Sequence, residues 1–140
     1  MKGLGAFVGG LLTVLLAACW PDGGTVCPAI AYGRTLVVEL AGDWPGDDGR
    51  TLLVDCDGPC SEVFVEDGAP GPGPGQLTVP LSDGRAEVSW TAPRDSVGLT
   101  VLGADGTELA EVDTDLDWVR VGGSEECGGP MHATVTVPAP

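Results

Sequence analysis

The chain alternates short apolar stretches with turn residues, and within each stretch the apolar positions recur with a period of two. The segments with this pattern are 36–40, 52–56, 63–65, 77–81, 86–90, 97–101, 110–112, 116–121 and 133–137. A period of two places successive side chains on opposite faces of a β-strand. No window has the 3.6-residue period of an amphipathic helix. The pattern therefore predicts eight or nine short strands.

The turn residues between these segments predict how the strands connect. Two turns each lie between two apolar segments and indicate hairpins: Ser-Asp-Gly-Arg at 82–85 and Ala-Asp-Gly-Thr at 104–107. Pro80 lacks a ladder donor and favours an edge strand, and the Gly-Pro repeats of 67–75 predict a loop. Strands spaced by about 8 to 12 residues are typical of two packed sheets. We expect an all-β, immunoglobulin-like antiparallel β-sandwich of about eight strands stapled by disulfides, with a small β-barrel as the alternative.

The first 18 residues have the organisation of a signal peptide. Lys2 precedes an apolar stretch over residues 4–18 that ends in small residues. This stretch is shorter than the roughly 20 residues that a helix needs to cross a bilayer. We therefore expect a signal peptide at 1–18 rather than a permanent single-span anchor.

Leu16-Ala17-Ala18-Cys19 resembles the lipobox of bacterial lipoproteins. The resemblance implies that the chain is cleaved before Cys19, whose sulfur then carries a diacylglyceryl lipid with acyl chains such as palmitate. Two or more acyl chains anchor a protein stably, so the protein would be exported and held on the outer face of the cell membrane. The alternative is an ordinary secretory signal that leaves Cys19 as a free thiol. Residues 19–26 would form a lipidated tether and 27–140 the sandwich domain.

Once Cys19 is assigned to lipid, four cysteines remain, and an even number in an oxidising compartment predicts two disulfides. Three pairings are possible. We favour Cys56 with Cys60, because an Asp-Gly-Pro turn between them can bring neighbouring strand ends together. Cys27 would then pair with Cys127 and close a loop of about 100 residues.

The chain is strongly acidic, with 6 Lys and Arg against 21 Asp and Glu and a net charge of −15. Removal of Lys2 with the leader leaves five arginines against the same 21 acids, a net charge of −16. Such a surface repels phosphate backbones and acidic headgroups, so we expect no nucleic-acid partner and no membrane contact other than the lipid on Cys19. The expected partners are cations, basic surfaces or neutral ligands, including an envelope protein or a cell-wall component.

The composition resembles that of proteins from GC-rich genomes, such as those of actinobacteria, being rich in Gly, Ala, Asp, Val and Arg and poor in Lys, Ile and Phe. The layout of leader, cysteines and strands is also similar to that of small exported actinobacterial lipoproteins with disulfide-bonded β-sandwich domains. Many of those have no assigned function, so the resemblance implies a location and a fold only.

Catalytic motifs are absent from the sequence. The single histidine, His132, falls on the polar face of a predicted strand, and there is no Gly-x-Ser-x-Gly elbow, His-Glu-x-x-His helix or phosphate-binding glycine loop. The Cys-x-x-x-Cys spacing of Cys56 and Cys60 resembles that of copper-delivery proteins of the thioredoxin fold. Those proteins place the motif beside a helix, and helical periodicity is missing here. We therefore expect a structural disulfide and no enzyme activity.

Two acidic stretches are candidate calcium sites, since calcium binds carboxylate oxygens in loops. Their weak candidate ligands are Asp113, Asp115, Asp117, Asp43 and Asp47. Neither stretch has the spacing of an EF-hand. We expect no resident cofactor, with calcium as the alternative.

These observations predict a membrane-anchored extracytoplasmic lipoprotein whose sandwich is a non-catalytic binding or envelope-interaction module for an unknown ligand. The Trp44 loop and the 67–75 loop are candidate contact surfaces. The alternatives are a calcium- or copper-handling protein, a small hydrolase, or a spacer in the envelope. Convergence of Asp43, Asp113, Asp115 and His132 in one pocket would favour the metal or hydrolase alternatives.

Overall fold

The computed structural model describes residues 24–46, 49–58, 60 and 63–140. The predicted leader, Cys19 and Asp47 lie outside these residues. The elements of the described chain are all strands: β1 Arg34–Ala41, β2 Thr51–Asp55, β3 Val63–Phe64, β4 Ala69–Pro70, β5 Gln76–Pro80, β6 Arg85–Trp90, β7 Ser96–Leu102, β8 Glu108–Asp115, β9 Val119–Arg120 and β10 Met131–Pro138. No helix in this part of the chain is long and apolar enough to cross a bilayer.

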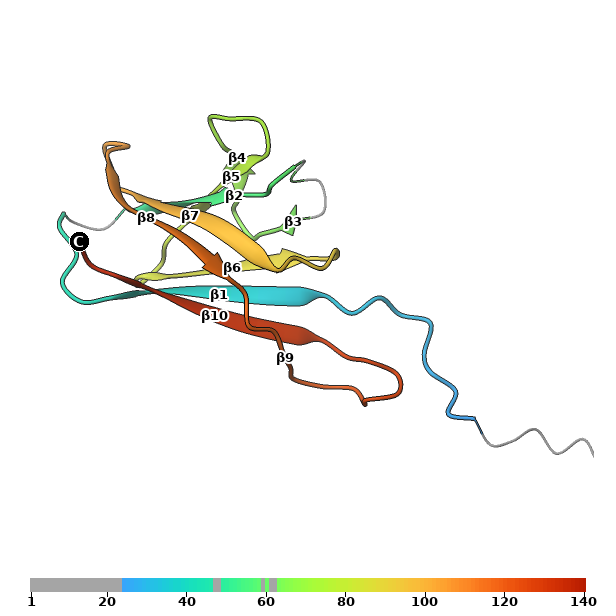
Figure 1. Cartoon of the computed structure of the whole chain (residues 1–140). Helices are drawn as coiled ribbons and strands as arrows, with labels where there is room; N and C mark the ends of the chain where they lie inside the picture. Colours follow the sequence, from blue (N-terminus) through green and yellow to red (C-terminus); the bar gives the residue numbers. More distant parts are fainter. Residues whose placement is uncertain (1–23, 47–48, 59, 61–62) are drawn as a thin grey trace, which may run out of the picture.

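The strands form two packed sheets of five, in the orders β3-β6-β1-β10-β9 and β4-β5-β2-β7-β8 (Figure 1). We call them the first and the second sheet. Both sheets have open edges, so the prediction of an all-β sandwich is confirmed and the closed barrel is wrong. Along the described strands the chain passes from one sheet to the other six times, at β1–β2, β2–β3, β3–β4, β5–β6, β6–β7 and β8–β9.

The last strand, β10, runs parallel to β1, which departs from the purely antiparallel arrangement that we expected. Their register aligns Leu36 with Ala133 and Val38 with Val135. The period-two pattern could not reveal this direction, because alternation reads the same along a strand in either direction. The parallel pair places the last strand of the chain beside the first.

The hairpin predicted at 82–85 is wrong, because β5 and β6 belong to different sheets. β5 pairs with β2 and β4, whereas β6 pairs with β1 and β3. The turn carries the chain across the sandwich, and Ser82 and Arg85 exchange two backbone hydrogen bonds of 2.9 Å within it. Two strands that face each other across a core have the same inward alternation as two neighbours in one sheet. The second predicted hairpin, formed by β7 and β8, is confirmed.

Pro80 ends β5, which is the second strand from the edge rather than the edge strand that we expected. The edge strand β4 reaches only Leu77 and Thr78 of β5. Pro80 therefore has no outer neighbour in the ladder, and its missing N–H group leaves no bond unmade.

The core lies between the sheets and consists of the inward side chains of both. Its largest fully buried members are Trp90, Leu36, Leu52, Leu99, Val38, Val54, Val88, Val101 and Val137. Trp90 packs edge to face against Trp118, with ring centroids 6.3 Å apart. The indole Nε1–H of Trp118 donates a 2.6 Å hydrogen bond to the carbonyl of Arg94. The segment that follows β8 is thereby attached to the loop that precedes β7.

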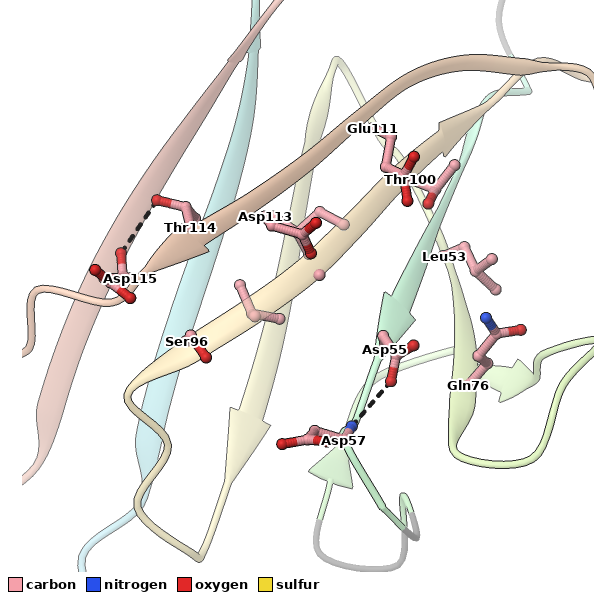
Figure 2. Close-up of a pocket in the computed structure, with 13 residues that line it drawn as sticks. Leu53, Asp55, Asp57, Gln76, Ser96, Thr100, Glu111, Asp113, Thr114 and Asp115 are labelled. Atoms are coloured by element: carbon pink, nitrogen blue, oxygen red, sulfur yellow. Dashed lines mark hydrogen bonds between the residues drawn. The ribbon is translucent and has the colours of Figure 1, made fainter.

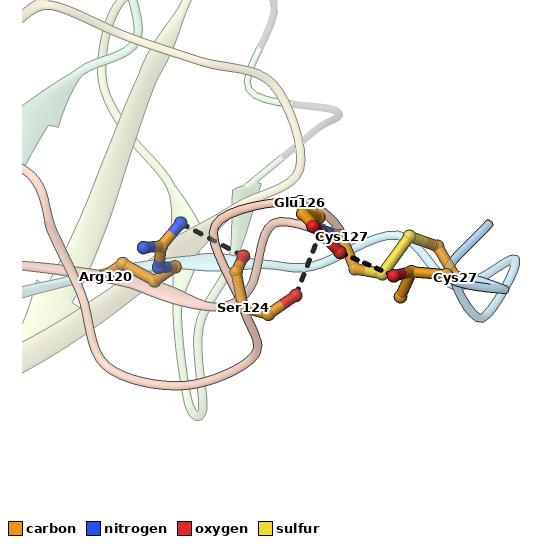
Figure 3. Close-up of a disulfide and its surroundings, with 6 residues drawn as sticks. Cys27, Arg120, Ser124, Glu126 and Cys127 are labelled. Atoms are coloured by element: carbon orange, nitrogen blue, oxygen red, sulfur yellow. Dashed lines mark hydrogen bonds between the residues drawn. A yellow bond between two sulfur atoms is a disulfide. The ribbon is translucent and has the colours of Figure 1, made fainter. Parts of the chain in front are cut away.

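Both predicted disulfides are present. Cys27 and Cys127, with Cα atoms 5.2 Å apart, connect the segment before β1 to the loop between β9 and β10 (Figure 3). Beside this disulfide, the hydroxyl of Thr25 donates a 2.6 Å hydrogen bond to Glu126. Cys56 and Cys60, with Cα atoms 5.4 Å apart, close a short loop after β2. That loop is not the hairpin expected around Cys56 and Cys60, because β2 and β3 lie in different sheets.

Candidate binding face on the second sheet

The outward side chains of the second sheet form regular rows across its strands. One row consists of Thr78, Leu53, Thr100 and Glu111, and the next of Gln76, Asp55, Gly98 and Asp113. Ser96 and Asp115 form a third, shorter row. The inward positions between them supply the core, so the alternation that builds the sandwich also exposes these polar residues together.

Gly98 produces a hollow in the middle of this face. A Cβ atom at Gly98 would lie 3.0 Å from Oδ1 of Asp113 and 3.3 Å from Cβ of Asp55. Its neighbours along β7 on this face, Ser96 and Thr100, are also small. The result is an open hollow of about 450 Å³ over β2, β7 and β8, which we call the acidic trough (Figure 2).

Among the residues that the structure describes, five carboxylates line the acidic trough, and no lysine, arginine or histidine does. They are Asp55, Asp57, Glu111, Asp113 and Asp115. Asp55 also shapes the end of the trough, because its Oδ1 accepts a 2.9 Å hydrogen bond from the backbone N–H of Asp57. That bond holds the turn after β2, in which Asp57 has a φ of 48°. The trough is therefore an anionic surface fixed on three strands and a turn.

A neighbouring hollow that shares two residues with the trough contains a basic residue. Arg94 lines it together with Asp95, and it shares Asp57 and Ser96 with the acidic trough. The guanidinium offsets part of the negative charge at that end only. The rows that contain Glu111 and Asp113 have no basic side chain on this face.

The structure separates the residues that the sequence proposed as metal ligands. Asp113 and Asp115 lie in the acidic trough, whereas Asp117 and Asp43 are exposed and do not line it. His132 lies on β10 of the first sheet, opposite Thr35 and Val119. The convergence that would have favoured a hydrolase or metal protein is therefore not found. Among the described residues, no three histidine, cysteine or acidic side chains are grouped as metal ligands.

Sequence reasoning missed Asp55, Asp57, Glu111 and Gly98. Asp55 and Glu111 were visible as polar positions of alternating strands. Their meeting depends on the order β2-β7-β8 and on the register that places Gly98 between Asp55 and Asp113. A glycine inside an otherwise regular strand was the one local signal, since such glycines mark close approach or missing bulk.

The two segments expected as contact surfaces are held mainly by hydrogen bonds within themselves. Arg50 donates hydrogen bonds of 3.2 and 2.7 Å to the carbonyls of Trp44 and Gly46. The 67–75 segment is not the uninterrupted loop that we expected, because it contains the edge strand β4 at Ala69–Pro70. Beyond β4, the N–H of Gly71 donates to the carbonyl of Gln76, and the carbonyl of Gly75 accepts from the N–H of Cys56. The Trp44 loop also borders a second hollow of about 310 Å³, lined by Arg50 and Asp105 among others. Neither loop lies in the acidic trough.

The fold and this face define a disulfide-bonded β-sandwich with a concave, acidic sheet surface. No protein-family model, curated protein or solved structure matches the chain.

Proposed function

We propose that this chain is an exported, lipid-anchored protein whose sandwich is a non-catalytic binding module, and that the acidic trough is the surface with which it binds a cationic ligand. The observation that carries the proposal is the set of five carboxylates around the hollow at Gly98, with no basic residue among the lining. Like charges held this close disfavour one another, and a cation placed between them relieves that repulsion.

The shape and chemistry of the trough favour an extended cation over a small apolar ligand. Small-molecule pockets are concave and mostly apolar, and they enclose most of the ligand. The acidic trough is open, and Leu53 is the large apolar side chain directed outward along its rows. A ligand that lies across several strands and offers several positive charges matches this surface best.

The cysteines and the leader support the proposed location. Two disulfides in a small domain suit an oxidising compartment outside the cytoplasm. The predicted lipobox at Cys19 supports attachment to the membrane. Mass spectrometry of the native protein tests this part. The expected result is a mature N-terminus at Cys19 that carries lipid, and in a Cys19→Ala variant the lipid and the membrane association should both be lost.

Titration of the purified full chain with hexalysine, followed by calorimetry at low and at physiological salt, tests the binding proposal. We expect saturable binding that weakens as salt rises. The double substitution Asp55→Asn and Asp113→Asn should weaken it about tenfold, since exposed charge pairs contribute about 0.2–1 kcal/mol each. The double substitution Asp43→Asn and Asp117→Asn removes two charges outside the trough and is the matched control. Absence of saturable binding, or equal losses in the control, would refute the proposal. Saturable calcium binding in its place would favour the calcium alternative.

A further inference from the structure

We propose that the partner of the acidic trough is an extended basic segment of another protein, which adds to the second sheet as a new strand along β8. This inference rests on the proposed function and names the class of its ligand.

β8 is a long open edge. It spans Glu108–Asp115 and, within the described chain, pairs only with β7. Its pairing with β7 is regular over residues 110–115 and is interrupted by a register shift between Val101 and Leu102. The six regular residues extend about 20 Å, and alternate residues direct their N–H and C=O groups away from β7. An exposed edge of this length is a template for an added strand, and proteins usually shorten or protect it.

The side chains of β8 select the charge of that strand. Glu111, Asp113 and Asp115 lie on the outer face of the strand and line the acidic trough. A second copy of this chain added at the same edge in antiparallel register would place carboxylates opposite carboxylates, which is destabilising. The same three side chains attract lysine or arginine at alternate positions of the incoming strand. The edge therefore opposes self-association and favours a basic partner.

The inner face of β8 defines the remaining positions of the partner. Ala110 and Val112 point toward the core but are only partly buried. Side chains alternate faces along a strand, and directly opposed residues of paired strands share a face. A partner with basic residues at every second position on the outer face would therefore place its intervening residues beside these two. Small apolar or β-branched residues at those positions would extend the core. The expected partner motif is therefore basic and apolar in strict alternation, with the long basic side chains reaching toward the hollow at Gly98.

The first sheet has a comparable edge without the charge. β9 pairs with Met131 and His132 only, so in the described chain the rest of β10 has no outer neighbour. The exposed side chains there are Thr134, Thr136 and the terminal Pro138 of the strand. If an open backbone alone were sufficient, this edge would bind the same peptide. It serves as an internal control.

The test uses the purified full chain and an acetylated, amidated peptide of sequence Lys-Val-Lys-Thr-Lys-Val-Lys. A second peptide has the same sequence with an N-methyl group on every backbone amide, which removes the donors of both strand edges and keeps the charge. Calorimetry measures affinity, and hydrogen exchange measures amide protection. We expect saturable binding of the first peptide, slowed exchange in 108–115 with none in 133–138, and at least tenfold weaker binding of the methylated peptide. Asp113→Asn should weaken binding at least threefold, whereas Asp117→Asn, just beyond β8, should change it less than twofold.

Each other outcome overturns the inference in a distinguishable way. If both peptides bind equally and the amides of 108–115 are not protected, strand addition is refuted and the proposed cation-binding trough remains. Slowed exchange in 133–138 in place of 108–115 would show that the peptide adds to β10 of the first sheet and not to β8. Protection of 108–115 in a protein that is dimeric without peptide makes a second copy the occupant. If neither the peptides nor hexalysine bind, the proposed function fails together with the inference.

Discussion

Asp55 and Asp113 flank Gly98 from the two neighbouring strands, so that two carboxylates lie on either side of the one position of their row without a side chain. A larger residue at this position would separate them or fill the space above them. The sheet instead keeps a hollow and negative charge at the same place (Figure 2). Such an arrangement costs some stability, and that cost is consistent with a surface kept for binding.

Neutralising one of these carboxylates should stabilise the fold. We expect Asp113→Asn to raise the free energy of unfolding by about 0.4 kcal/mol at low salt, because Asp55 and Asp113 lie two strands apart, about 10 Å, and like charges at that separation in water repel by this order. The gain should shrink in 1 M salt, where the Debye length falls to about 3 Å. Urea denaturation at the two salt concentrations measures it. A loss of stability at low salt would mean that Asp113 makes a favourable interaction in the folded protein.

Filling the hollow should impair binding and spare the fold. In Gly98→Ala the new methyl group would lie 3.0 Å from Oδ1 of Asp113, so that carboxylate must move. Alanine is favoured over glycine inside a strand by about 0.5–1 kcal/mol, which offsets the tight contact. We expect a melting temperature within a few degrees of the wild type and at least threefold weaker binding of hexalysine.

Gly33→Ala is the matched control for this substitution. Its methyl group would meet only the carbonyl oxygen of Trp90, at 3.9 Å, and Gly33 does not line the acidic trough. Hexalysine affinity should therefore match the wild type. Equal weakening in the two alanine variants would contradict a specific role for the hollow.

Much of the fold follows from local pattern, and the site does not. Alternation located β1, β2, β7 and β10 to within a few residues, because each strand must bury one face. Subtraction of Cys19 from the five cysteines led to the two disulfides that are present. The same reasoning could not give the strand order. Two strands that pair within one sheet and two strands that face each other across the core show the same alternation of inward apolar residues.

That ambiguity explains why Asp113 was chosen for the wrong reason. The sequence grouped it with Asp115 and Asp117, its neighbours along the chain. The structure groups it with Asp55, from a strand more than fifty positions earlier, because both pair with Gly98. A surface that spans several strands is defined by register, and register is a property of the whole sheet.

Acid should weaken the turn between β7 and β8 through Asp105. The backbone N–H of Thr107 donates a 3.0 Å hydrogen bond to Oδ1 of Asp105, and this bond lowers the pKa of the carboxyl group below its usual 3.8. A lowered folded-state pKa means that the stabilisation is present above pH 3.8 and is lost as pH falls through the folded-state value. Carboxyl chemical shifts followed by NMR from pH 2 to 6 should show Asp105 titrating below an exposed aspartate. In Asp105→Asn the acceptor remains and this part of the acid sensitivity should disappear.

The disulfide between Cys27 and Cys127 should contribute less than its long loop suggests. A cross-link across 100 residues restricts the unfolded chain by about 4.7 kcal/mol in the chain-entropy model. However, residues 24–33 form no strand and are almost all exposed, so breaking the bond also frees them in the folded protein. In the folded protein the disulfide also closes this short segment, so breaking it returns that closure entropy to the folded state. Closure entropy depends only weakly on loop length, by about 0.6 kcal/mol per doubling, so this gain offsets much of the gain in the unfolded chain.

We therefore expect the double variant Cys27→Ser and Cys127→Ser to lose about 2 kcal/mol of unfolding free energy. The five-residue loop of the other disulfide is valued at about 2 kcal/mol by the same model, and the comparison variant is Cys56→Ala with Cys60→Ala, because Cys56 is fully buried and a serine there would add the cost of a buried hydroxyl. Urea denaturation of both variants makes the comparison. Hydrogen exchange should show β1 and β10 still protected in the first variant, since their pairing begins at Arg34, after the segment 24–33. A loss near 5 kcal/mol, or exposure of the β1 amides, would show that the segment before β1 packs on the domain and that the disulfide secures that packing.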